Sequence, residues 1–369
     1  MGEHIIVSKQ KNKDNLSLPA FSISNKNGFI PQEEQFGKDN TYSKTDKSSN
    51  YIVKPKYFAY NPARINVGSI AYQNTITPVL VSSLYEIFRS DNNIDDVFLQ
   101  YWFRSEYFYK QIQRLQEGGV RQYFFIDKMR ESQIYLTNVS EQNKIGSIIS
   151  KLDKLLTLQQ RKLSLIKTLK RSFLSDLFFK TSTNSIVITL KQVTSIRGGY
   201  AFKSKEFTEN GYPIIKIANI SNNGEIKGPY SYTNNFNKKY ILTKNDIVLA
   251  MSGATTGKIA KLRSSKSFLQ NQRIGYFCKT NNIDYNYLYY LLISDQFKKQ
   301  LKRITIAGAQ PNVSSLDIEN FRFSVLSSKN KQKKISDFLN KLDIKIRITN
   351  KKITIFSQLK RSLLNNMFI

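Results

Sequence analysis

Two long stretches of the chain place apolar residues at steps of three and four, the spacing of a helix with one buried stripe. They begin at Glu141 and Lys331, and neither contains Gly or Pro past its first turn apart from Gly146. About 38 residues would give each a length of roughly 57 Å. Ser140 is the expected N-cap of the first. Two such stripes in one chain most simply pack together as a coiled coil. The predicted seam is Ile145, Ile148, Ile149, Leu152, Leu155, Leu156, Leu163, Ile166, Phe173 and Leu177, then Ile335, Phe338, Leu339, Leu342, Ile346, Ile353, Phe356, Leu363 and Met367.

Shorter runs between these stretches alternate apolar and polar positions and are rich in β-branched and aromatic residues, which predicts strands. An amphipathic pattern after Asp284 predicts a helix over 285–304, and its earlier equivalent is 96–115. We expect most of the aromatic residues there to lie in a core. The predicted strands are 184–193, 212–220, 245–252 and 273–279.

The chain repeats itself at a nearly constant offset. The stretch from Glu141 aligns without a gap with that from Lys331, an offset of 331 − 141 = 190. At an offset of 189, YIVKPKYFAYNPARINVGSIA lies over YILTKNDIVLAMSGATTGKIA, and LPAFSISN resembles YPIIKIAN. Agreement over separate blocks indicates two copies of one unit. Each copy is predicted to be a mixed α/β (α+β) lobe followed by a long basic helix.

The repeat divides the chain into four predicted segments. They are a first lobe over 1–139, a central helix over 140–180, a second lobe over 181–327 and a C-terminal helix over 328–369. The second copy has IVITLKQVTSIRGGYAF before its YPIIKIAN, whereas LPAFSISN begins already at Leu18. We therefore expect the opening strand of the first lobe to be shortened or missing.

The charge balance points to a polyanionic partner. Lys and Arg number 57 against 27 Asp and Glu, a formal net charge of +30. Nucleic acid is the leading partner, since neutralising phosphates releases condensed counterions. A membrane surface is the rival, but no apolar run approaches the roughly 20 residues of a membrane-spanning helix. There is no signal-peptide pattern either, so we expect a cytoplasmic protein that binds no membrane.

The chain offers little for catalysis. One Cys (Cys278) and one His (His4) leave no Cys/His metal cluster and no Cys–His pair. SGATTGKIA, at 252–260, resembles a phosphate-binding loop but is one residue short, and Ile259 stands where a magnesium ligand is needed. The first copy reads PARINVGSIA and keeps Gly68 without any Lys beside it. A turn between two strands explains both copies better than a nucleotide site.

The duplicated unit, with its LDKLL…LKRSFLSDLF and LDIKI…LKRSLLNNMF helices, resembles the specificity subunit of type I restriction–modification systems. Three further stretches of the second copy look like the ordered landmarks of such a domain: IRGGYAFKSKEF, NDIVLAMSGATTGKIA and AGAQPNVSSLDIENFRFSVL. In the first copy the last of these reads GGVRQYFFIDKMRESQIYL. The resemblance covers nearly the whole chain.

This resemblance implies a non-catalytic reader of double-stranded DNA with a pseudo-two-fold internal repeat. Each lobe would be a target-recognition domain for one half of a bipartite, asymmetric target. The long helices would pack antiparallel and set the spacer between half-sites. They would also dock two modification subunits, which bring S-adenosylmethionine and methylate adenine. Restriction subunits, which use ATP and Mg²⁺, would join that core, and this chain would bind no cofactor or metal itself.

Candidate DNA-binding residues lie in loops that differ between the copies. Arg, Asn and Gln are the side chains able to bond base edges in pairs. For any single one, contact with phosphate or plain exposure remains an alternative to base readout. The candidates are Arg64, Asn66, Arg121, Gln122, Tyr230, Thr255, Thr256, Lys258, Gln272, Arg273, Gln310 and Asn312.

Two other functions remain open from the residues alone. A basic coiled-coil scaffold could bind nucleic acid without reading its sequence. A self-contained methyltransferase or nuclease is the third possibility, but NPAR at 61–64 has Ala63 and Arg64 where an adenine methyltransferase motif needs proline and an aromatic residue. Binding of S-adenosylmethionine by the isolated chain would support that third function.

Overall fold

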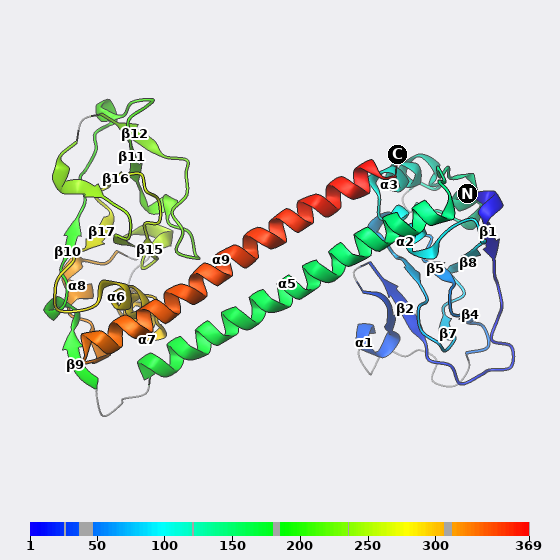
Figure 1. Ribbon diagram of the computed structural model, residues 1–369, viewed down its shortest axis with the longest axis horizontal. Coiled ribbons are helices and arrows are strands. Elements are labelled where there is room, and N and C mark those ends of the chain that lie inside the picture. Colours follow the sequence, from blue (N-terminus) through cyan, green and yellow to red (C-terminus); the bar gives the residue numbers. More distant parts are fainter. Residues whose placement is uncertain are drawn as a thin grey trace. The chain divides into compact units, whose positions relative to one another are not determined.

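The computed structural model describes residues 1–25, 27–36, 47–119, 122–179, 185–234, 236–305 and 312–368 (Figure 1). The chain divides into two compact units. Unit 1 comprises Met1–Arg161 and Thr349–Ile369, and unit 2 comprises Lys162–Ile348. Each unit contains one lobe and a part of each long helix.

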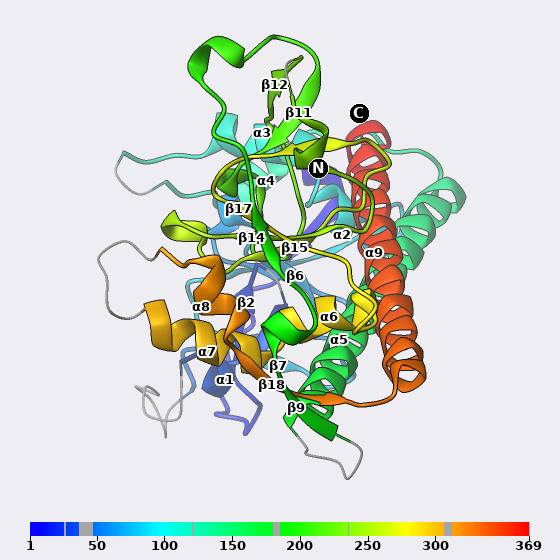
Figure 2. The same cartoon turned by 90° about the vertical axis from the view of Figure 1, so that its left-hand side faces the viewer.

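The lobe of unit 2 is built on two four-stranded sheets, with strand orders β10-β17-β14-β15 and β12-β11-β16-β13. The first sheet is antiparallel throughout. In the second, β11 and β16 run parallel, with Ile214 beside Leu269. A separate antiparallel pair, β9 with β18, is seen in Figure 2. The strands are β9 (Ser185–Thr189), β10 (Ile196–Gly198), β11 (Tyr212–Ile215), β12 (Ser231–Thr233), β13 (Ile241–Leu242), β14 (Ile247–Ala250), β15 (Ile259–Lys261), β16 (Phe268–Gln270), β17 (Ile274–Phe277) and β18 (Arg322–Leu326).

The lobe of unit 1 has one four-stranded sheet, ordered β1-β8-β5-β6, and two strand pairs, β2 with β3 and β4 with β7. All of these pairings are antiparallel. A parallel bridge joins Ala20, just before β2, to Leu80 of β7. The strands are β1 (Ile5–Val7), β2 (Phe21–Ser24), β3 (Gly28–Pro31), β4 (Tyr51–Val53), β5 (Phe58–Tyr60), β6 (Ile70–Tyr72), β7 (Val79–Val81) and β8 (Glu86–Ser90).

The two lobes share one topology, which confirms the internal repeat. The sequence alignment pairs β8 with β17, β5 with β14 and β6 with β15, and β1 lies beside β8 as β10 lies beside β17. The strand order β1-β8-β5-β6 of unit 1 is therefore the same as the order β10-β17-β14-β15 of unit 2. The parallel contact of Ala20 with Leu80 likewise corresponds to that of Ile214 with Leu269. The alignment of LPAFSISN on YPIIKIAN is therefore structurally correct, since it places Ala20 on Ile214.

The single helix predicted over 285–304 is wrong in one respect: the structure has two helices separated by a break at Ser294. The Ser294 hydroxyl donates to Leu291 O at 2.6 Å and accepts from the backbone N–H of Phe297 at 3.4 Å, so it caps the second helix. Ser105 breaks the first copy in the same way. The helices concerned are α2 (Asp96–Trp102), α3 (Glu106–Leu115), α6 (Tyr285–Leu292) and α7 (Asp295–Thr305), and the remaining short ones are α1 (Gln32–Phe36), α4 (Ile126–Glu131) and α8 (Ser315–Glu319).

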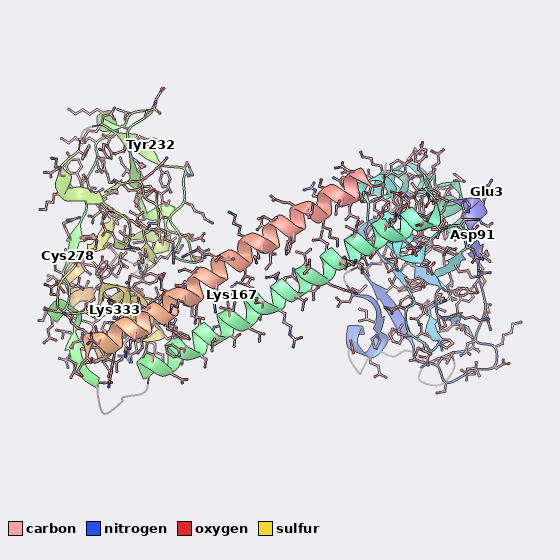
Figure 3. The ribbon with its side chains drawn as sticks, viewed as in Figure 1. Glu3, Asp91, Lys167, Tyr232, Cys278 and Lys333 are labelled. Atoms are coloured by element: carbon pink, nitrogen blue, oxygen red, sulfur yellow. The ribbon has the colours of Figure 1, made fainter. Side chains whose placement is uncertain are left out.

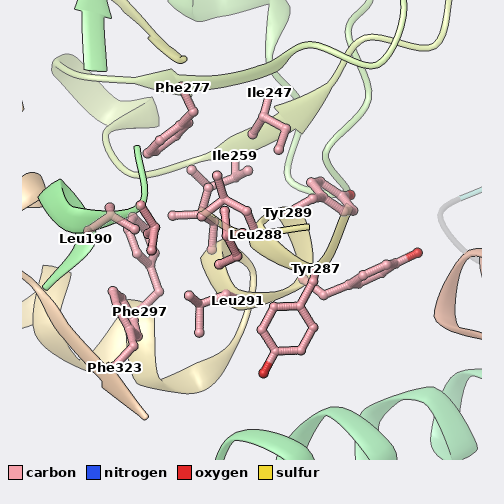
Figure 4. Packing of buried hydrophobic residues seen from close by; sticks show 14 of the residues in the cluster. Leu190, Ile247, Ile259, Phe277, Tyr287, Leu288, Tyr289, Leu291, Phe297 and Phe323 are labelled. Atoms are coloured by element: carbon pink, nitrogen blue, oxygen red, sulfur yellow. The ribbon is translucent and has the colours of Figure 1, made fainter. Parts of the chain in front are cut away.

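Each lobe has its own aromatic-rich core, as expected from the sequence. In unit 2, Tyr287, Leu288 and Leu291 of α6 belong to one core with Ile247 of β14 and Phe277 of β17 (Figure 4). In unit 1, Trp102, Phe108 and neighbouring rings fill the equivalent place. Burying these large side chains contributes roughly 1.5–3 kcal/mol each, so the aromatics belong to packing and not to a surface for stacking bases.

The long helices α5 (Val139–Phe179) and α9 (Lys329–Asn366) pack antiparallel in both units. In unit 1, Asp153 of α5 meets Lys360 of α9 at 2.5 Å. In unit 2, Lys170 meets Asp343 at 2.6 Å, and Phe173 packs on Phe338 with ring centroids 5.0 Å apart. Asp153 comes before Lys170 on α5, whereas its partner Lys360 comes after Asp343 on α9. The two helices therefore run in opposite directions.

Two details of the helix prediction are wrong. The cap of α5 is Asn138 and not Ser140, because the Asn138 side-chain oxygen accepts from the backbone N–H of Glu141 at 2.9 Å. The predicted seam is also too wide: Ile149, Leu152 and Leu339 are buried, but others of its residues are not. Those with exposed side chains are Ile148 at 48%, Leu155 at 43% and Phe338 at 40%.

The lobes differ at one edge. In unit 2, β18 pairs with β9 over five residue pairs, from Arg322 with Thr189 to Leu326 with Ser185. The equivalent segment of unit 1, residues 132–136, forms no strand in the part of the chain that the structure describes. Instead, the amino group of Met1 donates to Ser132 O at 2.9 Å.

Candidate nucleic-acid interface

The stretch SGATTGKIA is a loop between two antiparallel strands, as its sequence predicts. It leaves β14, makes one short turn and enters β15, with Leu249 opposite Ile259. A nucleotide-binding loop would lead from a strand into a helix. The equivalent loop of unit 1 joins β5 to β6. Both contain a glycine in the left-handed region, Gly68 at φ 85° and Gly257 at φ 82°, so the two loops share this conformation at one aligned position. They differ at another, because Gly253 has φ 73° where its aligned residue Arg64 has φ −135°.

Unit 1 has a cavity of about 970 Å³ beside its loop, and predicted residue Asn66 lines it. The β2–β3 turn forms the neighbouring wall. The hydroxyl of Ser69 donates to Ile23 O at 3.1 Å, and a Cβ at Gly68 would lie 3.7 Å from that of Asn25. The hydrogen bond of Ser69 holds β2, which leads into the turn, against the loop. The cavity wall therefore carries exposed amide side chains from separate segments: Asn25, Asn27, Asn66 and Asn74.

Basic side chains from α9 and from the turn between α2 and α3 line the same cavity. Arg104, Lys360 and Arg361 all contribute. The carboxylate of Asp153 lies 2.5 Å from Lys360 Nζ and 3.8 Å from an Arg104 guanidinium nitrogen, so its negative charge offsets part of their positive charge. Arg361 is exposed, and the described residues include no ion pair with it. A cavity with amides on one side and cations on another suits a ligand that carries both hydrogen-bonding edges and negative charge.

In unit 2, Thr256 lines a smaller cavity of about 200 Å³ together with Lys298 and Lys302 of α7. The Thr256 hydroxyl donates to Gly253 O at 2.7 Å and so stabilises the turn. The Thr255 hydroxyl is buried without a hydrogen-bond partner among the described residues. Of the two predicted threonines, Thr256 therefore stabilises the turn and Thr255 has its hydroxyl buried, while two cations of α7 lie nearby.

The other predicted residues fall into three groups. Arg64, Gln122, Gln272 and Arg273 are exposed, and Lys258 is half-buried. Asn312 lies beside the β14–β15 loop, bridged to Ser252. Arg121 and Gln310 lie outside the described residues.

Tyr230 differs from the rest because its ring belongs to a core. It packs edge-on against Phe268 with centroids 5.3 Å apart, and its hydroxyl donates to Ile226 O at 3.4 Å. Burial raises the pKa of Tyr230 above the ordinary value for tyrosine. The side chain therefore supports the lobe, and only its half-exposed edge is available to a ligand.

Several residues at these cavities were not predicted from the sequence. Lys298 and Lys302 are four apart on an amphipathic helix, so their helical face was a usable signal. Asn25, Asn74 and Arg361 carried no such signal, because only the folded chain brings them together.

Two polar clusters lie inside the lobes. Burial lowers the pKa of Lys261, whose amino group donates to Asn286 Oδ1 at 2.5 Å. The equivalent position of unit 1 is Tyr72, whose hydroxyl donates to Asp96 at 2.8 Å. These pairs join β15 to α6 and β6 to α2, and we assign them to packing. Among the described residues no group of acidic, His and Cys side chains could hold a metal ion, and no described helix is long and apolar enough to cross a membrane.

The structure thus defines a protein with two lobes of one fold, long basic helices and equivalent loops that carry different side chains. Type I restriction modification DNA specificity domains match this chain over residues 3–168 and again over 184–355, and the chain belongs to this family of specificity subunits. The two matches follow the two copies seen in the sequence and the fold.

Individual relatives agree with this assignment. The type I restriction enzyme MjaVIII specificity subunit of Methanocaldococcus jannaschii is 27% identical over 315 residues, which cover 78% of this chain and 72% of the relative. The S subunit of a type I restriction–modification system from M. genitalium has a similar fold, with a TM-score of 0.66 at 15% identity over 100% of this chain and 94% of the other. A chain from a structure of complex assembly and conformational transition of the type I system has a TM-score of 0.53 at 13% identity, over 98% and 95%.

Proposed function

We propose that this specificity subunit reads a bipartite, asymmetric DNA target, one half-site with each lobe. The observation that supports this most directly is the pair of equivalent loops. Gly68 and Gly257 take the same left-handed conformation at aligned positions, while Asn66 in one loop is replaced by Thr255 in the other. Lobes of one topology that carry different side chains are what two different half-sites require.

The basic side chains would supply affinity for DNA that does not depend on the base sequence. Arg361 at the cavity of unit 1 and Lys302 at that of unit 2 would contact phosphates near the bases that each lobe reads. Other exposed cations, including Lys167 on α5 and Lys333 on α9, lie on the long helices (Figure 3). The net charge of +30 suits this arrangement.

We further propose that the helices dock two modification subunits, which carry S-adenosylmethionine and methylate adenine, and that restriction subunits using ATP and Mg²⁺ join that core. Exposed apolar side chains on α5 and α9 support two equal docking sites, because the same four repeat positions are exposed in each unit. They are Ile148, Leu158, Ile355 and Leu359 in unit 1, and Phe338, Ile348, Leu165 and Leu169 in unit 2.

Selection from randomised duplex DNA tests the proposal. The chain, assembled with its modification subunits, is expected to enrich one split sequence by roughly a thousandfold or more over random duplex. Enrichment of every duplex alike would leave the basic scaffold as the function. Methyl transfer by the isolated chain would contradict its assignment as a non-catalytic subunit.

A further inference from the structure

The cavity of unit 1 differs from that of unit 2 in the chemistry of its side chains. Four exposed asparagines line it: Asn25, Asn27, Asn66 and Asn74. At the positions of Asn66 and Asn74 the second copy has Thr255 and Arg263. A side-chain amide offers a donor and an acceptor together, whereas a hydroxyl or a guanidinium cannot present that pair in one plane.

Asn66 is the one of the four that lies in the β5–β6 loop. It is exposed, it sits two residues before Gly68 in the β5–β6 loop, and its amide has no hydrogen-bond partner within the described residues. Gln73, by contrast, donates to Thr77 O and accepts from the N–H of Thr75, so its amide is occupied by the fold. The Asn66 amide is therefore available to a ligand, and the loop that carries it is fixed by Ser69.

We propose that Asn66 is a specificity-determining residue that reads adenine in the first half-site, through the N6 donor and N7 acceptor of an A·T pair other than the methylated one. The inference rests on the proposed function and assigns one base contact to it. Asparagine pairs with adenine in this bidentate way. At the equivalent position of unit 2 the hydroxyl of Thr255 is buried and does not face a ligand. The exposed cation Arg361, which lines the same cavity, would contact the backbone of the same half-site.

A reciprocal exchange tests this assignment. Asn66→Thr, in the chain assembled with its modification subunits, is expected to lose preference at one A·T pair of the first half-site by roughly tenfold to a hundredfold. All other positions of the target should keep their preference. Thr255→Asn is expected to change preference only within the second half-site.

A matched control uses the same substitution elsewhere on the same lobe. Asn92 is exposed, lies between β8 and α2, and does not line the cavity. Asn92→Thr should leave the selected target unchanged. Circular dichroism and urea unfolding of all three variants check that each is folded.

Base analogues supply a second measurement that does not depend on selection. Replacing the adenine identified above by 7-deazaadenine removes the N7 acceptor and should weaken binding of the unmodified chain about as much as Asn66→Thr does. The variant should not distinguish adenine from the analogue. Equal sensitivity of both proteins to the analogue would overturn the contact.

The outcomes separate this inference from the proposed function. A split target that Asn66→Thr leaves unchanged at every position refutes the role of Asn66 and keeps the function. A uniform loss of affinity with a shallower salt dependence makes Asn66 a phosphate contact and also refutes it. If the unmodified chain selects no sequence at all, the function and the inference both fail.

Discussion

Lys170 of α5 and Asp343 of α9 form an ion pair of 2.6 Å in unit 2, and both side chains are largely buried. The hydroxyl of Tyr290 donates to the other carboxylate oxygen at 2.9 Å. In unit 1 the same three residue types meet as Lys360, Asp153 and Tyr101. The fold thus uses one Lys–Asp–Tyr cluster twice, once to tie each lobe to its part of the helix pair.

Asp343→Asn is expected to destabilise the protein by about 1–3 kcal/mol, because Lys170 would stay buried without a counter-charge. Urea unfolding measures the change. Glu225→Gln, in the exposed pair with Lys227, is the control and should cost at most about 1 kcal/mol. Equal effects of the two substitutions would mean that the buried cluster contributes no more than a surface pair.

Tyr101 is expected to make the free energy of unfolding depend on pH in the alkaline range. Burial, followed by the charge of Asp153, raises the pKa of Tyr101 to about 12. An unfolded tyrosine titrates near ~10. The folded chain therefore keeps a proton that the unfolded chain loses. The stabilising contribution is complete below pH ~10 and disappears as the pH rises toward 12.

Tyr101→Phe should accordingly make the free energy of unfolding fall less steeply over this alkaline range. Urea unfolding at a series of pH values measures the slope. Tyr135→Phe is the matched control, because that ring is exposed, and it should leave the slope unchanged. An unchanged slope for Tyr101→Phe would show that the phenol is not protonated more strongly in the fold.

Two adjacent glycines should respond differently to the same substitution. A Cβ at Gly199 would lie 2.1 Å from the backbone oxygen of Asn271, whereas one at Gly198 meets nothing within 4 Å. Gly199→Ala is expected to destabilise unit 2 by about 1–3 kcal/mol, since backbone would have to move. Gly198→Ala should be close to neutral. Thermal unfolding compares the two, and similar melting temperatures would disprove the close approach at Gly199.

If α5 and α9 set the distance between the two half-sites, lengthening both helices should lengthen the gap in the preferred DNA target. Inserting seven residues near Leu163 and seven near Ile353 keeps the helical phase nearly constant and adds about 10 Å to each helix. The gap between half-sites should grow by roughly three base pairs. Selection from randomised duplexes measures the gap. If it stays the same, the helices do not determine it.

The proposed docking sites on α5 and α9 predict how many modification subunits each variant binds. Leu158→Glu places a charge at a leucine whose side chain is 59% exposed on α5, and Ile348→Glu does the same at 52% exposure on α9. Each single variant should bind one modification subunit and the double variant none, as measured by native mass spectrometry. Leu84→Glu, on a lobe, is the control. Two subunits bound to the double variant would exclude these positions from the docking sites.

Repetition made much of this fold predictable from the sequence. The alignment of LPAFSISN on YPIIKIAN placed Ala20 over Ile214, and both take part in the same parallel contact. The long helices followed from spacing alone. The break at Ser294 did not, because a serine between apolar turns fits a helix interior as well as a cap until tertiary packing decides.

The site was less predictable than the fold. Asn66 was predicted because it lies two residues before a shared glycine, and the structure places it at the cavity of unit 1. Asn25 and Arg361 were missed because 336 positions separate them (361 − 25), and only the folded chain brings both to one cavity. The exposed Ile148 and Leu155 were assigned to the seam because periodicity identifies apolar positions but does not say which of them a second helix covers.

The repeated cluster makes each long helix complementary to itself. Asp153 and Lys170 both lie on α5, and Asp343 and Lys360 occupy the same two repeat positions on α9. Two identical α5 helices, placed head to tail, would therefore form both ion pairs. Two separate copies of one half, each a lobe with its own long helix, therefore carry the charges needed to assemble as a symmetric pair through the same two contacts.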